Sequence, residues 1–230
     1  MLLIIYIIYI LKIEKKIYFK KINNLKMQIV TWNVAGLRAM LKKEYFKLFL
    51  ESVEYDIICL QETKAEEHQV KLPEFILNNY PFMYWNSSKG TTQRKGFSGT
   101  TIWSKIRPLK MYTPDFDEEG RICVFEFEKI ILVNVYVPNS QKFESDRYYF
   151  RKEWNKKFSN FIDTIKYKEI IICGDLNVAH LDIDIYKPQQ KKNKIAGFFD
   201  FEREDYANLI KNFDLVDIFR VRNPNINKST

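Results

Sequence analysis

The chain is poor in the residues that build disulfide scaffolds, zinc sites and flexible linkers. Its 230 residues contain three cysteines, two histidines, seven glycines and seven prolines. An odd number of cysteines without paired spacing argues against a disulfide framework and against a zinc site. Each cysteine lies inside an apolar run, which predicts reduced thiols in a core: Cys59, Cys123 and Cys173. The length permits one large domain or two small ones, and no internal repeat stands out.

A long hydrophobic run is also lacking. The apolar stretch from Leu2 to Leu11 has ten residues, whereas a membrane-spanning helix needs roughly 20, so we expect no membrane partner. Two interpretations of residues 1–26 stay open: a targeting segment, or a misannotated start before Met27. We therefore divide the chain into an N-terminal extension, 1–26, and one domain, 27–230.

Positive charge is present but unevenly placed. The chain has a net charge of +8, and residues 1–26 hold six lysines against one acidic residue, Glu14. Five of the eight charges therefore belong to the extension. The weakly basic remainder permits nucleic-acid binding without arguing for it. Hydrophobic residues make up 46% of the chain and aromatic residues 16%, which excludes wholesale disorder and supports a sizeable core.

From residue 27 onward the hydrophobic pattern alternates between strand and helix. Apolar runs predict strands at 27–34, 55–63, 80–87, 97–105 and 169–175, and two adjoining strands within 120–140 that turn near Glu128 and Lys129. Helical spacing predicts helices at 36–52, with Leu41, Tyr45, Leu48 and Phe49 on the buried face, at 146–166, and from near Phe201 to 213. Residues 215–224 indicate a short strand or a turn. This mixture predicts an α/β sandwich.

Polar side chains follow four of these strands at the point where each one ends. In α/β folds, ligand sites gather at the carboxyl ends of strands. Carboxylate and amide oxygens suit Mg²⁺, with Mn²⁺ as an alternative, and a nearby aspartate can activate a water for attack on phosphorus. The residues at these strand ends are Asn33, Glu62, Tyr136, Asn139, Asp175 and Asn177.

Six motifs in this order carry a resemblance to a known family. They are TWNVAGLRAML, ICLQETK, GFSGTTIWSK, EEGRICVFEF, NVYVPNS and GDLNVAH. Together they resemble the exonuclease III family of AP endonucleases, within the wider endonuclease/exonuclease/phosphatase superfamily, over residues 27–225. The resemblance implies a four-layer αββα sandwich, here incomplete at its C-terminus. It also implies Mg²⁺-dependent cleavage of duplex DNA on the 5′ side of abasic sites, as in base excision repair, by a monomer.

The resemblance also implies a role for each matching residue. Glu62 would be the main Mg²⁺ ligand, with Asn33, Asp175 and Asn177 in the same metal site. Asp175 would activate the attacking water, Asn177 would hold the water or the phosphate, and Tyr136 would support the scissile phosphate. The residues expected to contact phosphate or the DNA backbone are Lys64, Arg94, Lys95, Asn139 and Arg147.

Structural interpretations of some of these residues stay open beside the functional ones. Tyr136 would otherwise be a core aromatic residue, Asn139 would shape a turn, and Arg147 would pair with an acidic residue. His68 and His180 match no catalytic position and are expected to be structural. Ala35 stands where many relatives have a polar residue, which predicts slightly weaker metal binding.

The end of the chain departs from the family pattern, which continues to a terminal Asp-His pair. We therefore expect either an incomplete gene model or a destabilised, catalytically impaired domain with an unpaired strand edge. The alternative function is that of a non-catalytic DNA-binding or degraded product. The nucleus is the expected compartment, and the extension would suit a mitochondrion or a plastid.

Overall fold

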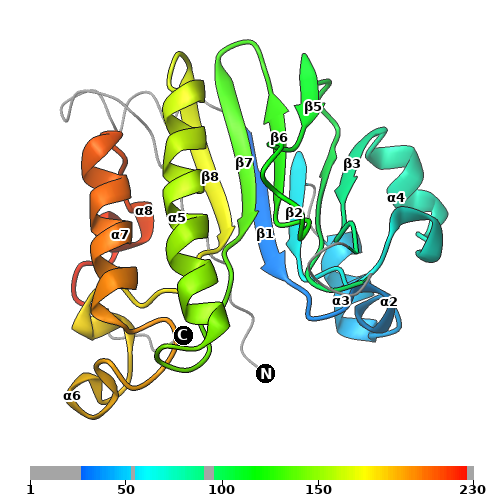
Figure 1. Ribbon diagram of the computed structural model, residues 1–230. Helices are drawn as coiled ribbons and strands as arrows, with labels where there is room; N and C mark the ends of the chain where they lie inside the picture. The colour runs from blue at the N-terminus through cyan, green and yellow to red at the C-terminus, as the bar shows by residue number, and fades with distance from the viewer. Residues whose placement is uncertain (1–26, 53–54, 91–95, 227–230) are drawn as a thin grey trace.

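Two four-stranded sheets pack face to face and helices cover both outer faces (Figure 1). The computed structural model describes residues 27–52, 55–90 and 96–226, so the expectations for residues 1–26 lie outside the described part. The first sheet has the order β1-β2-β4-β3 and the second the order β5-β6-β7-β8. The four-layer αββα sandwich expected from the sequence is confirmed.

The elements follow the expected alternation, but the sequence analysis did not predict the short strand β5 or the short helices α4 and α6. The strands are β1 (Ile29–Asn33), β2 (Ile57–Gln61), β3 (Phe82–Asn86), β4 (Thr100–Ser104), β5 (Lys110–Tyr112), β6 (Ile122–Glu126), β7 (Ile130–Tyr136) and β8 (Glu169–Asp175). The α-helices are α2 (Leu37–Met40), α3 (Glu44–Ser52), α4 (Glu74–Asn79), α5 (Asp146–Ile165), α6 (Pro188–Lys191), α7 (Asp200–Asn212) and α8 (Ile218–Arg222). Two 3₁₀ turns are η1 (Glu67–Gln69) and η2 (Asp182–Asp184). Within the described ranges, no helix combines the length and apolar character that crossing a membrane requires.

One parallel strand pair in each sheet brings polar strand ends together. β1 pairs in parallel with β2 and places Asn33 opposite Gln61, while β7 pairs in parallel with β8 and places Tyr136 opposite Asp175. The close pairing at the end of β8 requires Gly174, because a Cβ at this position would lie 1.9 Å from the carbonyl oxygen of Val135. The sheet register therefore fixes where the polar side chains emerge.

A buried polar bridge joins the two sheets within their apolar interface. Gln61 on β2 donates from Nε2 to Oδ1 of Asn134 on β7 at 2.6 Å and to Oγ1 of Thr31 at 2.8 Å. Asn134 in turn donates from Nδ2 to the carbonyl oxygens of Leu60 at 3.0 Å and Thr101 at 2.9 Å. Both amide side chains are buried. Because these bonds satisfy groups from facing sheets, they fix how the sheets lie relative to each other.

The parallel strands β1 and β8 form sheet edges in the described part of the chain. There, β1 pairs only with β2 and β8 only with β7. Their side chains are nevertheless mostly buried, since Ile29 of β1 and Ile171 of β8 pack in one cluster between the sheets. Ile218 of α8 packs in the same cluster and helps to shield it from solvent.

The C-terminal segment 215–224 corrects one prediction. Residues Ile218–Arg222 form helix α8 instead of a strand or a turn. Asp217 caps this helix, because its carboxylate accepts a hydrogen bond from the backbone N–H of Arg220 at 2.9 Å. An aspartate directly before an apolar residue favours the start of a helix, because its carboxylate can cap the first turn. Here this preference for a helix is stronger than the preference of the β-branched residues for a strand.

The helix expected at 36–52 is also different, because it breaks into α2 and α3. The break shifts the phase of the second helix, so that Phe46 and Leu50 face the core. Tyr45 and Leu48, which the uninterrupted pattern placed inside, are 43% and 54% exposed. The prediction was wrong because a continuous period of 3.6 residues cannot describe two short helices.

The inter-sheet bridge yields a stability prediction. Asn134→Leu keeps the number and branching of the side-chain heavy atoms but leaves buried polar groups of β2 and β4 without their partner. We expect a loss of about 2–3 kcal/mol in the free energy of unfolding, measured by urea denaturation. The matched control is Asn79→Leu on α4, whose exposed amide bonds the carbonyl of Phe75 at 2.8 Å. Equal losses in the two variants would contradict the bridge.

Candidate active site

The candidate site is built on backbone turns with unusual conformations. Glu62 follows β2 with a φ of 53°, Lys64 has a φ of 49°, and Asn177 follows β8 with a φ of 47°. Ala35, two residues after Asn33, has a φ of 48°. Left-handed conformations are uncommon in residues other than glycine and concentrate at functional sites. Four of them therefore mark the edge where β1, β2 and β8 end.

Asn33 lies at the centre of this edge and connects the two sheets. Its Nδ2 donates to Oε1 of Glu62 at 3.0 Å and to Oδ2 of Asp175 at 2.8 Å, although Asp175 is 142 residues away along the chain. Its Oδ1 accepts the backbone N–H of Ala35 at 3.0 Å. Asn33 thus presents a donor to the carboxylates, and its oxygen is bonded to the backbone instead of facing them.

Glu62 is held as an anion by three donors. Tyr136 donates its hydroxyl to Oε1 at 2.7 Å, Asn33 donates to the same oxygen, and the Lys64 ammonium lies 2.8 Å from Oε2. Burial by itself would raise the pKa of Glu62, but the hydrogen bonds from Lys64, Asn33 and Tyr136 lower it below its usual value. The carboxylate therefore remains charged at neutral pH.

Asp175 has the opposite electrostatic environment. Burial raises the pKa of its carboxyl, and the nearby charge of Glu62 adds to this effect, while hydrogen bonds from Asn33 and from the N–H of Asn177 oppose it. Two neighbouring carboxyls whose environments move their pKa values apart are typical of acid–base chemistry. Asp175 is consequently the better proton acceptor and Glu62 the more persistent charge.

Tyr136 is positioned by an ion cluster that sequence reasoning missed. Arg121 is fully buried, donates from Nη1 to the carbonyl oxygen of Tyr136 at 3.0 Å and lies 4.7 Å from the centre of the Tyr136 ring. Glu119 accepts from Nε of Arg121 at 2.6 Å. Burial and the charge of Glu62 raise the pKa of Tyr136, so its hydroxyl stays protonated and can donate. An arginine at the start of an apolar strand was the available signal.

The two remaining asparagines meet beside this group. Asn177 donates from Nδ2 to the carbonyl oxygen of Val137 at 2.8 Å, and its Oδ1 lies 3.4 Å from Nδ2 of Asn139. Asn139 also accepts the backbone N–H of Gln141 at 2.8 Å, which gives it the turn-shaping role that stayed open. The strand-end residues that the sequence indicated therefore all lie at one edge.

The residues expected to face DNA are placed in three different ways. Lys64 forms an ion pair with Glu62. Arg147 donates to both oxygens of Glu119, at 2.7 and 3.1 Å, which is the pairing with an acidic residue that the sequence left open. Arg94 and Lys95 lie outside the described residues. Lys64 and Arg147 are therefore both engaged within the protein.

Neither histidine contacts the candidate site residues in the interactions that the structure shows. His180 is half-buried against the ring of Tyr206, with ring centres 4.9 Å apart, and burial lowers its pKa. His68 is exposed in η1, with Nδ1 3.4 Å from a carboxylate oxygen of Glu66. These placements agree with the structural roles expected for them.

The donor set at this edge fits a hard divalent cation. Glu62 and Asp175 both bond the single Nδ2 of Asn33, so their carboxylates converge on one point. Mg²⁺ needs only one or two carboxylates and keeps several waters. In the described ranges no group of three or more His, Cys, Asp or Glu side chains could hold a metal. Glu62, which keeps its charge, is the residue that would hold the ion, and Asp175 lies beside it.

Comparison with known proteins gives consistent results along most of the chain. A model of the Endonuclease/Exonuclease/phosphatase family matches residues 30–219. An exodeoxyribonuclease of Bacillus subtilis is 40% identical over 200 residues, which cover 84% of this chain and 75% of that protein. A DNA-(apurinic or apyrimidinic site) endonuclease of Dictyostelium discoideum is 33% identical over 89% of this chain and 56% of its own length. The solved structure of an AP endonuclease from Archaeoglobus fulgidus superposes with a TM-score of 0.73 at 25% identity, covering 86% of this chain and 75% of that one.

The carboxylate pair yields a titration prediction. In the metal-free protein, NMR titration of the side-chain carboxyl carbons should give Glu62 a pKa below its usual value and Asp175 one above it. Tyr136→Phe and Lys64→Met should each raise the pKa of Glu62, because each removes a group that stabilises its anion. Lys43→Met, which removes an exposed lysine elsewhere, is the control. A Glu62 pKa that does not respond to either site variant would refute the arrangement.

Proposed function

The chain belongs to the endonuclease/exonuclease/phosphatase family, in its branch of exonuclease III-type AP endonucleases, and from this membership we propose that it is a Mg²⁺-dependent DNA repair phosphodiesterase that cuts duplex DNA on the 5′ side of abasic sites. The observation that carries the proposal is the pair Glu62 and Asp175, joined by Asn33, with opposite pKa shifts. One carboxylate keeps its charge and the other is a base, which hydrolysis of a phosphodiester requires.

The chain's own residues divide the reaction between them. Asp175 accepts the proton of the attacking water, since its raised pKa makes it a stronger base than an ordinary aspartate. Asn177, held by the carbonyl of Val137, orients that water beside Asp175. The amide of Asn139 lies beside Asn177 and would donate to a phosphate oxygen, where negative charge develops. The single proton of the Tyr136 hydroxyl is donated to Glu62 in this structure, so Tyr136 would donate to phosphate only after turning away from Glu62.

A divalent ion at Glu62 would supply positive charge to a non-bridging phosphate oxygen. Glu62 would hold the ion, and Asn33 keeps Glu62 and Asp175 at a fixed spacing. In this structure the ammonium of Lys64 neutralises Glu62 from 2.8 Å. A bound ion would take over that role, and the Lys64 side chain, which is 46% exposed, would then turn toward a DNA phosphate. This supports duplex DNA as the partner.

A second activity within the same class has its own support. The Bacillus relative, at 40% identity, is an exodeoxyribonuclease, so removal of nucleotides from a 3′ end is the competing reaction. Both reactions use the same water and the same carboxylates. They differ in the group on the 3′ side of the scissile phosphate, which is an abasic sugar in one reaction and a terminal nucleotide in the other. The two activities are therefore distinguished by comparing cleavage of an abasic duplex with digestion of an intact duplex from its 3′ end.

Nicking of a duplex that carries one abasic site tests the proposal directly. We expect Mg²⁺-dependent cleavage on the 5′ side of the site, faster than digestion of an intact duplex from its 3′ end. Asp175→Asn should lower kcat by about 100- to 10,000-fold, because the base is lost. The product lengths on a denaturing gel distinguish nicking from 3′ digestion.

The control for this variant is Asp163→Asn, which removes an exposed acid of α5 that pairs with Lys166. It should leave kcat unchanged. Full cleavage in the presence of EDTA would refute the metal requirement. Salt-dependent binding of the duplex without nicking in Mg²⁺ or Mn²⁺ would instead indicate a DNA-binding protein without catalysis.

Glu62→Gln tests the division of labour between the two carboxylates. We expect the Mg²⁺ concentration for half-maximal rate to rise roughly tenfold or more, with part of kcat restored at saturating Mg²⁺. The physical reason is that the amide keeps the shape of Glu62 but removes the charge that attracts the ion. Glu153→Gln, at an exposed position of α5, is the matched control. An unchanged Mg²⁺ requirement would exclude Glu62 as the main ligand.

A further inference from the structure

A buried arginine lies behind the site, on the inner face of α5. Arg151 is 3% exposed and occupies the stripe of the helix that also carries Trp154 and Phe158. A charge on the apolar face of a helix is costly unless its donors are satisfied. Burial lowers the pKa of this guanidinium to about 10, so it remains charged at neutral pH.

The guanidinium bonds the two backbone segments that carry the site residues of the second sheet. Its Nη1 donates to the carbonyl oxygen of Pro138 at 2.5 Å and lies 3.4 Å from that of Asn177, and its Nη2 donates to the carbonyl oxygen of Leu176 at 3.2 Å. Pro138 directly precedes Asn139, and Leu176 lies between Asp175 and Asn177. One side chain therefore ties segment 137–139 to segment 175–177.

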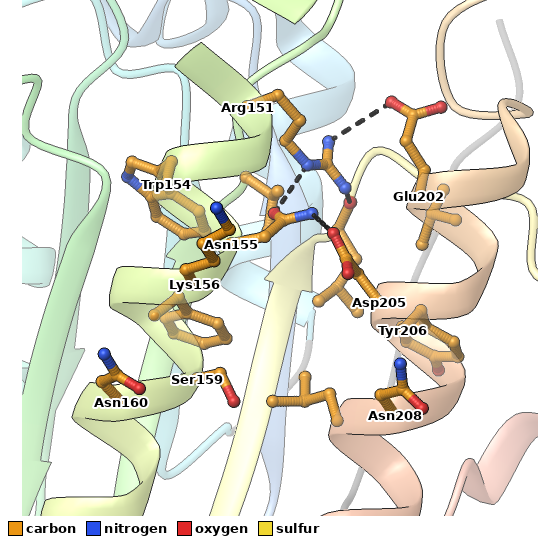
Figure 2. A pocket seen from close by; sticks show the side chains of 15 residues that line it. Arg151, Trp154, Asn155, Lys156, Ser159, Asn160, Glu202, Asp205, Tyr206 and Asn208 are labelled. Atoms are coloured by element: carbon orange, nitrogen blue, oxygen red, sulfur yellow. Dashed lines mark hydrogen bonds and ion pairs between the residues drawn. The ribbon is translucent and has the colours of Figure 1, made fainter. Parts of the chain in front are cut away.

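Two helices hold Arg151 in this position. Asn155, one turn later on α5, accepts from its Nε at 2.8 Å, and Glu202 of α7 lies 3.8 Å from its Nη1 (Figure 2). Glu202 is itself fully buried and accepts the hydroxyl of Ser140, the residue after Asn139, at 2.7 Å. Helices α5 and α7 therefore both bond the chain around Asn139, α5 through Arg151 to Pro138 and α7 through Glu202 to Ser140.

We propose that Arg151 is a positioning residue for phosphodiester cleavage, whose fork of donors keeps Asn139, Asp175 and Asn177 in their mutual geometry. The inference rests on the proposed function and deepens it, because Arg151 reaches the site segments through their backbone carbonyls alone. A lysine retains the charge, but one ammonium cannot reproduce the planar fork that bonds carbonyls of both segments. The structure therefore assigns the role to the shape of the guanidinium.

A pocket beside Arg151 allows this assignment to be tested by chemical rescue. The pocket has a volume of about 240 Å³, lies between α5 and α7, and is lined by Arg151 together with Trp154, Glu202 and Leu209 (Figure 2). Arg151→Ala would extend this pocket to the carbonyls that the guanidinium now bonds. A methylguanidinium ion can then enter from solvent and replace the missing group.

The experiment compares Arg151→Lys and Arg151→Ala with wild type in the nicking assay on an abasic duplex. We expect kcat to fall about 10- to 100-fold in both variants while KM stays within about twofold, since misplacement of reacting groups affects the chemical step. Added methylguanidinium chloride should restore kcat of Arg151→Ala in a saturable manner, and ammonium chloride at the same ionic strength should not.

Arg203 offers the matched control. It lies on α7, donates from Nε to the carbonyl oxygen of His180 at 2.8 Å and pairs with Asp182 at 2.9 Å, so it also ties a loop carbonyl to a helix, away from the site. Arg203→Ala should keep kcat and show no rescue. Unchanged kcat in Arg151→Lys would overturn the proposal, and so would a loss in Arg151→Ala that methylguanidinium does not restore.

Hydrogen exchange separates this proposal from the proposed function. Peptides that cover 137–141 and 175–179 should exchange faster in Arg151→Lys than in wild type, whereas peptides of β2 and β4 should not change. If the wild-type chain does not nick DNA, the proposed function fails, and this local acceleration still supports the tie between the two segments. Uniform acceleration over the whole chain, or none, overturns it.

Discussion

The hydrogen-bonded bridge between Gln61 and Asn134 is the constraint on which the site geometry depends. Two sheets that pack through apolar side chains alone can slide, because hydrophobic contact has little directionality. Asn134 bonds carbonyls of two strands in the facing sheet, and Gln61 bonds Asn134 in return. Since unmade buried hydrogen bonds cost about 1–3 kcal/mol each, one alignment of the sheets is strongly favoured over its neighbours. In that alignment the end of β2 faces the end of β7.

The candidate site has a second amide that joins the two sheets, at the edge of the sandwich. Asn33 lies opposite Gln61 in the sheet and joins Glu62, the residue after Gln61, to Asp175 at the end of a strand in the other sheet. Two carboxylates that close together repel each other, and the protein resolves the repulsion unevenly. Glu62 receives three donors and keeps its charge, whereas Asp175 is more deeply buried and carries the raised pKa. Glu62 and Asn177, which follow the two strands, both adopt left-handed backbone conformations.

The sequence predicted the parts of this arrangement that depend on local pattern. Apolar runs that end in Asn33, Glu62, Tyr136 and Asp175 indicated the strands, and ordered motifs indicated the family. The interrupted helix at 36–52 and helix α8 were mistaken because break and cap signals were given less weight than periodicity. Arg151 and Asn134 were missed although each left a signal, namely a polar residue inside a buried stripe. Their contacts could not be read from the sequence, since Gln61 and Asn134 lie 73 residues apart and nothing local specifies that pairing.

Two buried ion clusters explain why the end of β7 can carry so much of the site. Arg121, which pairs with Glu119, donates to the carbonyl oxygen of Tyr136. Arg151, which lies near Glu202, donates to the carbonyl oxygen of Pro138. Replacing buried ion pairs by apolar residues is often neutral or stabilising, so stability alone gives a weak reason to keep them. Both guanidiniums, however, donate to backbone that flanks Tyr136 and Asn139. Charged donors thus hold the backbone of this segment at both ends, and such restraint is what preorganisation of a site for a phosphodiester would require.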